Sequence, residues 1–488
     1  MALPETTTSR LRSASGFAYA NRIGSFAISL GSIAILARLL PPHQFGLVAM
    51  ATTTIGLLGT FREFGLSAAA IQAPTLPDED RDALFWFNFL STTAVSCAVL
   101  LIAPAVASFY REPQVEFLLK LAALGFFISG LSTQHNALLR RTLSFGAIFM
   151  ADFGGLFIGS AVAVALAIYS ADAVSLVVGS IVQAAFSSVV TIWLGRWLPH
   201  APRNLRAHLK HASFGANVSV FSLLNFLTNN IASIVVGRWG DATAMGFLNR
   251  AQSLYALPSN FILGPYLQVQ FPLLCRAFNN DEETRRIYSS LLLFTGITFI
   301  PAGVVLPFVA ADLTRIILGP QWIETGRILA WFSPAIVSLG LIGPFGQYMT
   351  SQGRVRELSL WGLGDFAIRG GGAAFGAVFG AQQAAAGFSL ATLVVATPIL
   401  VWITVRHGPF RFRDYVSSGY PGILIGLTTL VAVLLSKMIA DSGSIESLVL
   451  VLSFSGTAWI LTMFALARTR DLLLRPNPKG NNVGALQK

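Results

Sequence analysis

Long apolar stretches divide the amino-acid sequence, and they restrict the possible folds more than any other feature. A helix needs roughly 20 mostly apolar residues to cross the hydrocarbon core of a bilayer. The sequence therefore predicts an all-α polytopic membrane protein with about 14 transmembrane helices. The fourteen stretches lie near residues 17–38, 44–70, 83–110, 115–138, 144–169, 173–194, 213–237, 242–271, 287–310, 323–348, 358–381, 383–404, 420–440 and 445–467. Pro258 and Pro265 predict a kink in the long stretch 242–271.

The composition excludes most other classes of protein. Hydrophobic residues make up 54% of the 488 residues and charged residues only 11%. Soluble domains carry about 25% charged residues, so this chain cannot cover a water-facing surface of ordinary size. A soluble enzyme, a disordered chain and a fibrous repeat are all excluded.

The positive charge of the chain predicts its orientation. The sequence has 33 Lys and Arg against 22 Asp and Glu, a net charge of +11. With the N-terminus inside the cell, 22 basic residues fall in cytoplasmic segments, five in outer loops and six within the spans. The five outer ones are Arg38, Arg111, Arg238, Arg315 and Lys437. This split follows the positive-inside rule, so we expect both termini in the cytoplasm, and the charge requires no nucleic-acid partner.

The longest polar stretch, from Gly195 to His211, contains three histidines and four basic residues. The histidines are irregularly spaced and no Cys or acidic residue lies near them. This pattern favours a cytoplasmic linker that faces lipid headgroups over a metal site. Cys97 and Cys275 lie in or beside apolar stretches and are expected to be buried free thiols. We expect no metal and no cofactor.

The two halves of the chain resemble each other. Leu36-Ala37-Arg38 followed by Phe45-Gly46 recurs 200 residues later as Val236-Gly237-Arg238 followed by Met245-Gly246. Because six spans separate the copies, both have the same orientation, which makes this a parallel repeat. The predicted organisation is an N-terminal lobe of six helices (1–195), a basic linker (196–212), a C-terminal lobe of six helices (213–405), two extra spans (406–467) and a basic cytoplasmic tail (468–488).

Polar residues follow one face of the first helix of each lobe. Arg22, Ser25 and Ser29 share one face of the first span, and Asn225 and Asn229 occupy the equivalent face 200 residues later. Ser and Gly are common where membrane helices pack closely, which is the alternative explanation. A run of Asn residues fits packing less well, because each unsatisfied amide is costly in hydrocarbon. The pattern favours a water-filled cavity between the lobes.

Ionisable residues within the spans mark a second set of candidates, since a charge at the bilayer centre costs roughly 2.5–3.5 kcal/mol on insertion scales. Arg250 lies about 10 Å, and Arg369 about 16 Å, inside its span at 1.5 Å per residue. Asp365 precedes Arg369 by one turn. Two interpretations of Arg369 remain open, an intrahelical salt bridge or an anion-binding arginine held by Asp365. Asp152 and Asp365 are candidates for ion coupling.

No Walker loop, nucleophile elbow or catalytic pair of carboxylates is present. Several motifs instead resemble the polysaccharide transporter family, the Wzx-type lipopolysaccharide and exopolysaccharide flippases of the multidrug/oligosaccharidyl-lipid/polysaccharide superfamily. The resemblance covers most of the first 150 residues. It rests on Ala37-Arg38-Leu39-Leu40-Pro41-Pro42-His43-Gln44-Phe45-Gly46, Glu63-Phe64-Gly65-Leu66-Ser67, Ala70-Ile71-Gln72, Phe109-Tyr110-Arg111-Glu112-Pro113 and Ala137-Leu138-Leu139-Arg140-Arg141.

This resemblance implies a multi-pass protein of the bacterial inner membrane, a transporter rather than an enzyme. It would flip undecaprenyl-pyrophosphate-linked oligosaccharides outward by alternating access, with a polysaccharide polymerase and chain-length machinery as candidate partners. A pyrophosphate needs cations in a low-dielectric cavity, and sugars need hydroxyl and amide partners. The hypothesis is that Arg22, Arg250 and Arg369 meet the pyrophosphate, whereas Ser25, Ser29, Asn225 and Asn229 meet the sugar.

Three alternatives stay open. A cation-coupled drug antiporter is expected to carry an acidic residue in the first lobe, where only Asp152 could serve. A lipid II flippase has a similar architecture, although the first-loop motif favours the polysaccharide branch. A membrane sugar polymerase or ligase, which is a different class, usually has a sizeable outer loop that this sequence lacks.

Overall fold

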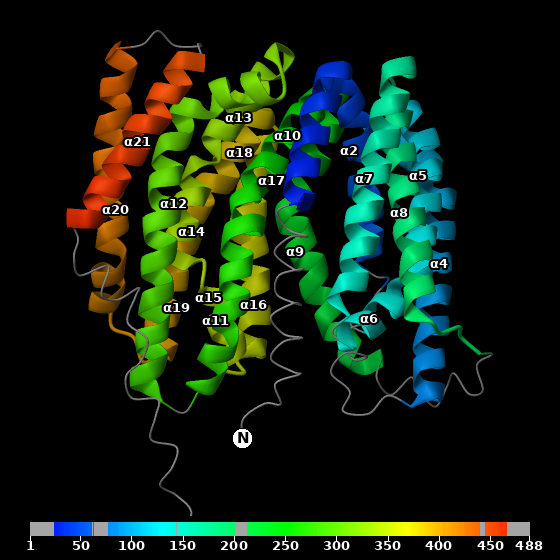
Figure 1. Cartoon of the computed structure of the whole chain (residues 1–488), viewed down its shortest axis with the longest axis horizontal. Helices are drawn as coiled ribbons and strands as arrows, with labels where there is room; N and C mark the ends of the chain where they lie inside the picture. Colours follow the sequence, from blue (N-terminus) through cyan, green and yellow to red (C-terminus); the bar gives the residue numbers. More distant parts are fainter. Residues whose placement is uncertain are drawn as a thin grey trace, which may run out of the picture. The chain divides into compact units, whose positions relative to one another are not determined.

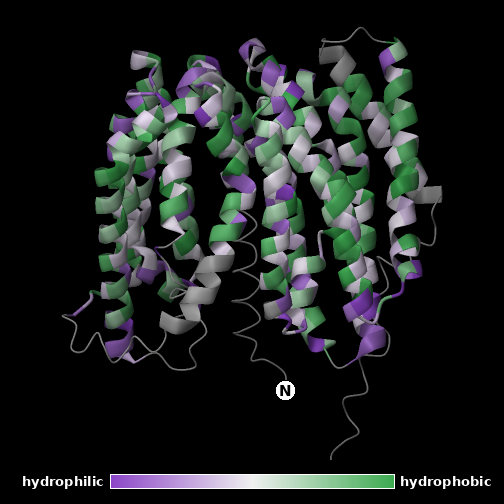
Figure 2. Cartoon of the chain, turned by 180° about the vertical axis from the view of Figure 1, so that it is seen from behind, coloured by the Kyte–Doolittle hydropathy of each residue, from purple (hydrophilic) through white to green (hydrophobic). Residues whose placement is uncertain are grey.

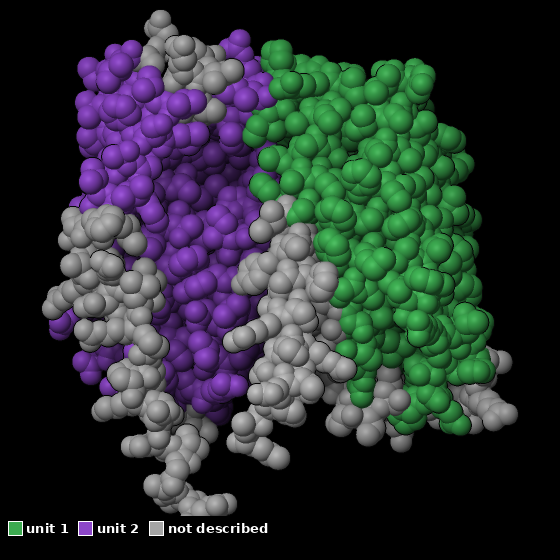
Figure 3. All heavy atoms as spheres, in the orientation of Figure 1, with its two compact units in different colours: residues 1–250, 317–322, 374–384 green, residues 251–316, 323–373, 385–488 purple. Residues whose placement is uncertain are grey.

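The computed structural model describes residues 24–60, 62, 77–142, 144–200, 212–278, 280–439 and 445–465. Every regular element in these ranges is a helix (Figure 1). The chain separates into two compact units, coloured in Figure 3. The first contains Met1–Arg250, Ile317–Trp322 and Ala374–Ala384, and the second Ala251–Ile316, Ile323–Ala373 and Ala385–Lys488. The predicted lobe boundaries stay a prediction.

The first unit is built from long helices around an aliphatic core. In chain order these are the helix Gly24–Leu39, α2 (Pro42–Gly59), α4 (Asp78–Tyr110), α5 (Gln114–Leu131), α6 (Thr133–Arg141), α7 (Phe145–Ser170), α8 (Ala173–Gly195), α9 (Ala212–Trp239) and α10 (Ala242–Pro258). The short helix η3 (Pro320–Trp322) also belongs to this unit. Leu47 and Met50 of α2, Leu118 and Leu119 of α5, and Met245 of α10 are fully buried in the core.

The second unit begins within α10 and packs around an aromatic core that includes Tyr288, Phe299 and Tyr348. Its elements are η2 (Ser259–Leu263), α11 (Gly264–Arg276), α12 (Asp281–Ile317), α13 (Ile323–Trp331), α14 (Ser333–Ile342), α15 (Phe345–Ser351), α16 (Val355–Asp365), η4 (Phe366–Gly370), α17 (Gly371–Ala377), α18 (Ala381–Leu390), η5 (Ala391–Ala396), α19 (Thr397–His407), α20 (Phe412–Ile439) and α21 (Ile445–Ala465). The last residue of α12 and part of α17 and α18 belong to the first unit.

Among the residues that the structure describes, eight helices are long and apolar enough to cross a membrane, so the chain is a multi-pass membrane protein. They are Asp78–Tyr110, Gln114–Arg141, Gly146–Ser170, Ala173–Gly195, Asp281–Ile317, Pro320–Ser351, Ala381–His407 and Phe412–Ile439. Two shorter apolar helices, Gly24–Leu39 and Val449–Thr462, overlap two further predicted spans. Helices also cover most of the described parts of the other predicted stretches, but the count of fourteen spans and the cytoplasmic termini stay predictions.

The surface of these helices is that of a protein in lipid. Figure 2 shows hydrophobic residues along the lengths of the helices and hydrophilic ones mainly near their ends. Large apolar side chains are exposed, among them Leu101, Tyr169 and Met438. In water such a surface would be unfavourable, whereas acyl chains solvate it. Cys97 and Cys275 are also exposed, so the expectation that both thiols are buried is wrong.

The stretch that carries Pro258 and Pro265 departs from a regular α-helix. The π-helix η2 follows Pro258 directly, and Pro265 occupies the first turn of α11. Pro265 has no N–H to donate to the preceding turn, and directly before it the N–H of Gly264 donates to the carbonyl oxygen of Ser259, five residues back, as in a π-helix. A second π-helix, η4, lies between Asp365 and Gly371.

Candidate functional site

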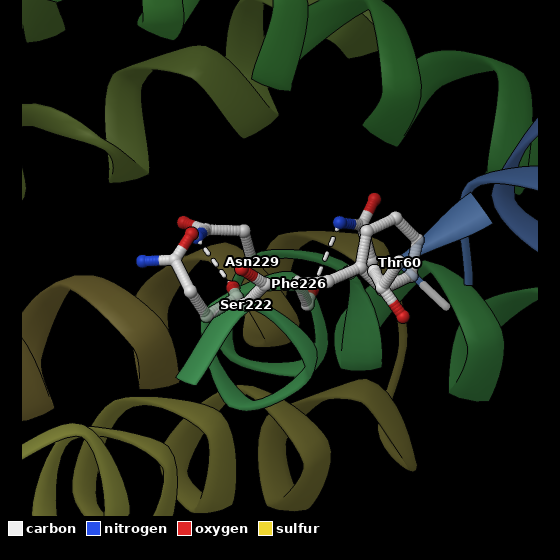
Figure 4. Close-up of a pocket in the computed structure, with 6 residues that line it drawn as sticks. Thr60, Ser222, Phe226 and Asn229 are labelled. Atoms are coloured by element: carbon white, nitrogen blue, oxygen red, sulfur yellow. Dashed lines mark hydrogen bonds between the residues drawn. The ribbon is translucent and has the colours of Figure 1, made fainter. Parts of the chain in front are cut away.

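A pocket of about 510 Å³, lined mainly by residues with polar side chains, lies in the first unit where α9 meets the end of α2. Its walls are Thr60, Ser222, Asn225, Phe226, Asn229 and Asn230, four of which are labelled in Figure 4. Gly56 makes this arrangement possible. A Cβ atom on Gly56 would lie 2.7 Å from Cε2 of Phe226, so a larger residue at this position would force the ring to move away from α2.

The polar side chains of the pocket are held by the backbone of their own helices. Asn229 donates from Nδ2 to the carbonyl oxygen of Asn225 at 2.7 Å, and Asn230 does the same to Phe226 at 2.9 Å. The hydroxyl of Thr60 donates to the carbonyl of Leu57 at 2.7 Å. These hydrogen bonds fix the positions of the two amides and the hydroxyl in the wall of the pocket. The remaining donors and acceptors of these groups suit the wall to ligands that are rich in hydroxyl groups.

The pocket brings together two of the predicted site residues, Asn225 and Asn229. Ser25 and Ser29 lie half-buried on the helix Gly24–Leu39 and do not line the pocket. This helix meets α7 at its first residue, where a Cβ atom on Gly24 would be 2.7 Å from the ring of Phe153. Asp152, the neighbour of Phe153, is half-buried on α7. Arg22 lies outside the described residues.

Arg250 lies on α10 and is packed against an aromatic ring. Its guanidinium carbon is 4.9 Å from the centre of the Phe45 ring, and Nη2 donates to Oδ1 of Asn249 at 2.7 Å. Phe45 itself meets the indole of Trp322 edge-on, at 5.1 Å between ring centres. Arg250 is thus part of an aromatic cluster in the first unit and is not a wall of the pocket.

In the second unit, Arg369 and Asp365 form the ion pair that their spacing indicates. Nε of Arg369 lies 2.8 Å from Oδ1 of Asp365, and both side chains are largely buried. The guanidinium also lies 5.1 Å over the ring of Phe388. Gly372, three residues further on, touches the backbone of Gly387, a close approach that a Cβ atom would prevent.

Sequence reasoning missed four of the pocket residues as site residues. Ser222 and Asn230 share the polar character of α9 that identified Asn225 and Asn229, and this signal could have included them. Thr60 and Phe226 carry no such signal, because they join the site only through the packing of α2 on α9. In the described part of the chain, no cluster of three or more His, Cys, Asp or Glu could hold a metal ion.

Two solved structures of membrane transporters are similar to this chain in fold. The lipid II flippase MurJ in an inward closed conformation superposes with a TM-score of 0.70 at 14% identity, covering 93% of this chain and 98% of that one. An inward-facing multidrug resistance transporter of the MATE family superposes with a TM-score of 0.57 at 16% identity, covering 80% of this chain and 93% of that one. These likenesses define the fold.

Comparison with related sequences identifies the family of the chain. The lipopolysaccharide biosynthesis protein WzxC of Escherichia coli K12 is 24% identical over 67% of each chain. The succinoglycan biosynthesis transport protein ExoT of Rhizobium meliloti is 23% identical over 83% of this chain and 82% of its own. Residues 35–326, more than half of the chain, match the family model of polysaccharide biosynthesis proteins, and the chain belongs to this family.

Proposed function

We propose that this protein is a flippase that moves undecaprenyl-pyrophosphate-linked oligosaccharide repeat units across the bacterial inner membrane by alternating access. The product would supply lipopolysaccharide or exopolysaccharide synthesis. Membership of a polysaccharide biosynthesis family, together with a transporter fold, supports this class of function. The observation that carries the proposal is the pocket with three asparagine side chains within a membrane helix bundle.

The pocket walls fit the sugar part of such a substrate. Asparagine amides and hydroxyls both donate and accept, as sugar hydroxyls require, and the Phe226 ring offers an apolar face for a sugar ring. We assign Asn225 and Asn229 to the sugar, with Ser25 and Ser29 as further polar contacts on the first helix. The lipid tail needs no protein site, because it can stay in the bilayer.

The arginines Arg22, Arg250 and Arg369 are assigned to the pyrophosphate. A guanidinium binds phosphate through two parallel hydrogen bonds and keeps its charge in a low-dielectric site. Aromatic rings pack against both the Arg250 and the Arg369 guanidinium, and the charge of Arg369 is in addition paired with Asp365. Two six-helix lobes, with both termini in the cytoplasm, complete the proposed transporter, and a polymerase and chain-length machinery are its proposed partners.

A strain that lacks the protein tests the proposal. We expect lipid-linked repeat units to accumulate on the cytoplasmic side and surface polymer to disappear, with both effects reversed by the intact gene. A lost polymerase would instead leave single repeat units exported, which separates this class from the flippases. Export that continues unchanged in the deletion strain contradicts the proposal.

Two other substrates are alternatives within the same fold. Lipid II is one, since the MurJ structure covers 93% of this chain, and a cationic drug is the other. Purified protein in vesicles can be offered each class in turn. If the protein moves lipid II or a drug but not the lipid-linked oligosaccharide, the transported molecule is its substrate and the proposed substrate is wrong.

A further inference from the structure

The turn between α19 and α20 joins two membrane spans of the second unit. The spans are Ala381–His407 and Phe412–Ile439, so only residues 408–411 connect them. At about 3.6 Å per residue, this connection reaches about 14 Å in all, or about 7 Å outward and 7 Å back. The headgroup layer on one side of a bilayer is about as deep. The turn and the adjoining helix ends therefore lie at the level of the lipid headgroups.

An aromatic contact fixes this turn. The ring of Phe410 is buried, with its centre 4.5 Å from that of Tyr288 and 4.9 Å from that of Tyr348. Gly408 packs so closely that a Cβ atom there would lie 2.5 Å from the phenol oxygen of Tyr348. The residues on either side of Phe410 are therefore held at the surface in a defined arrangement.

Positive charge is in excess at the turn. Residues 406–414 contain three arginines and one acidic residue, Asp414. Asp414 forms an ion pair with Arg285 from the start of α12, which Figure 1 shows at the same end of the second unit. It also accepts a hydrogen bond from the backbone N–H of Arg411 at 2.8 Å. In the described part of the chain, the guanidinium groups of Arg406, Arg411 and Arg413 form no ion pair, so three positive charges remain.

Arginines at several other helix ends have acidic partners. The ion pairs are Arg81 with Asp78, Arg286 with Glu283, Arg327 with Glu324 and Arg354 with Glu357. Each pair spans one turn of a helix, and its charges cancel within the pair. The α19–α20 turn differs, because its three arginines are left to attract an anion from outside the protein.

The helices beside the turn present apolar surface to the lipid. Trp402, one turn before Arg406 on α19, is 56% exposed, and the Arg406 guanidinium carbon lies 5.0 Å from the centre of its ring. On α20, Phe412, Val416 and Tyr420 are exposed at four-residue spacing and so share one face. Phospholipids have the same order of groups, with a phosphate at the surface and acyl chains toward the bilayer centre.

We propose that the α19–α20 turn binds the headgroup of an anionic phospholipid such as phosphatidylglycerol through Arg406, Arg411 and Arg413. A guanidinium binds phosphate through two parallel hydrogen bonds. Phosphatidylcholine also has a phosphate, but the excess of arginines repels its positive choline group. The exposed faces of α19 and α20 favour a lipid over free phosphate, because acyl chains can lie against them. Such a lipid binds whether or not the protein moves the proposed substrate.

Native mass spectrometry of the full-length protein with equal amounts of phosphatidylglycerol and phosphatidylcholine tests the proposal. We expect the native protein to retain phosphatidylglycerol in preference, and Arg411→Gln/Arg413→Gln to retain it several-fold less. Both side chains are exposed, so the double variant should fold normally. Arg140→Gln/Arg141→Gln is the matched control, because it removes the same charge at the end of α6 in the first unit. Equal retention in the native protein and Arg411→Gln/Arg413→Gln, or an equal loss in the control, overturns the proposal.

The melting temperature in lipid nanodiscs gives a second test with a different variant. Replacing phosphatidylcholine by phosphatidylglycerol should raise the melting temperature of the native protein, and clearly less that of Arg406→Gln. This variant leaves residues 408–411 unchanged, so it keeps the anchored turn. Arg406→Lys should recover part of the rise, because an ammonium keeps the charge but not the guanidinium fork. An equal rise in all three proteins contradicts binding at the turn.

Inorganic phosphate distinguishes a lipid site from a site for free phosphate. At millimolar concentration it should leave the bound phosphatidylglycerol in place, because it makes no contact with the exposed apolar faces of α19 and α20. If it displaces the lipid completely, the turn binds phosphate alone and the lipid is not its ligand, which overturns the proposal.

Discussion

Gly46 on α2 and Gly246 on α10 make reciprocal contacts in the first unit. A Cβ atom on Gly46 would lie 1.6 Å from the carbonyl oxygen of Ala242, and one on Gly246 would lie 2.1 Å from the carbonyl oxygen of Pro42. The partners are displaced by the same 200 residues as the glycines. The repeat in the sequence thus corresponds to a local two-fold arrangement of the two helix starts.

This relationship predicts that alanine is not tolerated at either glycine. The added methyl group would meet backbone atoms, which cannot rotate away, so we expect Gly46→Ala and Gly246→Ala to cost about 1–3 kcal/mol each. The melting temperature of the purified protein measures the loss. Gly31→Ala is the matched control, because nothing lies within 4 Å of a Cβ atom at that position. Equal melting temperatures for all three variants would contradict the contact.

The pocket predicts a graded loss of transport on α9. Removing an amide that contacts a sugar hydroxyl should cost about 0.5–1.5 kcal/mol, which is roughly 2- to 10-fold in apparent affinity. We expect that loss for Asn225→Ala and for Asn229→Ala, with a larger one for the double variant. Complementation of polymer export in a deletion strain, at matched protein levels, measures it.

Thr228→Val is the control on the same helix. Thr228 is buried, bonds to the Leu224 carbonyl and does not line the pocket. Export should therefore continue in this variant. A loss of export as large as that in Asn229→Ala would mean that α9 is sensitive to any substitution. This result would contradict the assignment of Asn225 and Asn229 to the sugar.

The positions of the helices could be predicted from the sequence, because the bilayer fixes the length of an apolar span. The same reasoning found Asn225 and Asn229, since consecutive amides in an apolar helix need an explanation. It could not find Thr60 and Phe226, because their place depends on which helix packs across from Gly56. Contacts between distant segments depend on the shapes of side chains throughout the helix bundle, so they cannot be predicted from a local sequence pattern.

The ion pair of Arg369 and Asp365 predicts that substitutions of these residues affect the stability of the protein and its transport activity differently. Removing either charge alone leaves its largely buried partner without a counter-ion, so Arg369→Gln and Asp365→Asn should each lower the melting temperature. The double variant removes both charges and should recover most of the loss. If Arg369 binds the pyrophosphate, however, transport stays defective in the double variant. Recovery of transport together with stability would show that the pair is structural only.

The charge of Arg250 can be tested by substitutions that keep the packing of its side chain. Its side chain covers the Phe45 ring, so Arg250→Lys keeps the positive charge and the apolar stem, whereas Arg250→Gln loses the charge. If Arg250 meets the pyrophosphate, export should fall about 10-fold or more in the Gln variant and less in the Lys variant, because lysine binds phosphate through one point charge instead of a fork. Phe45→Leu serves as the control for the aromatic contact, since it removes the ring and leaves the charge. Export at the native level in Arg250→Gln, with normal folding, would remove Arg250 from the site, and the same result for Arg22 and Arg369 would end the pyrophosphate assignment.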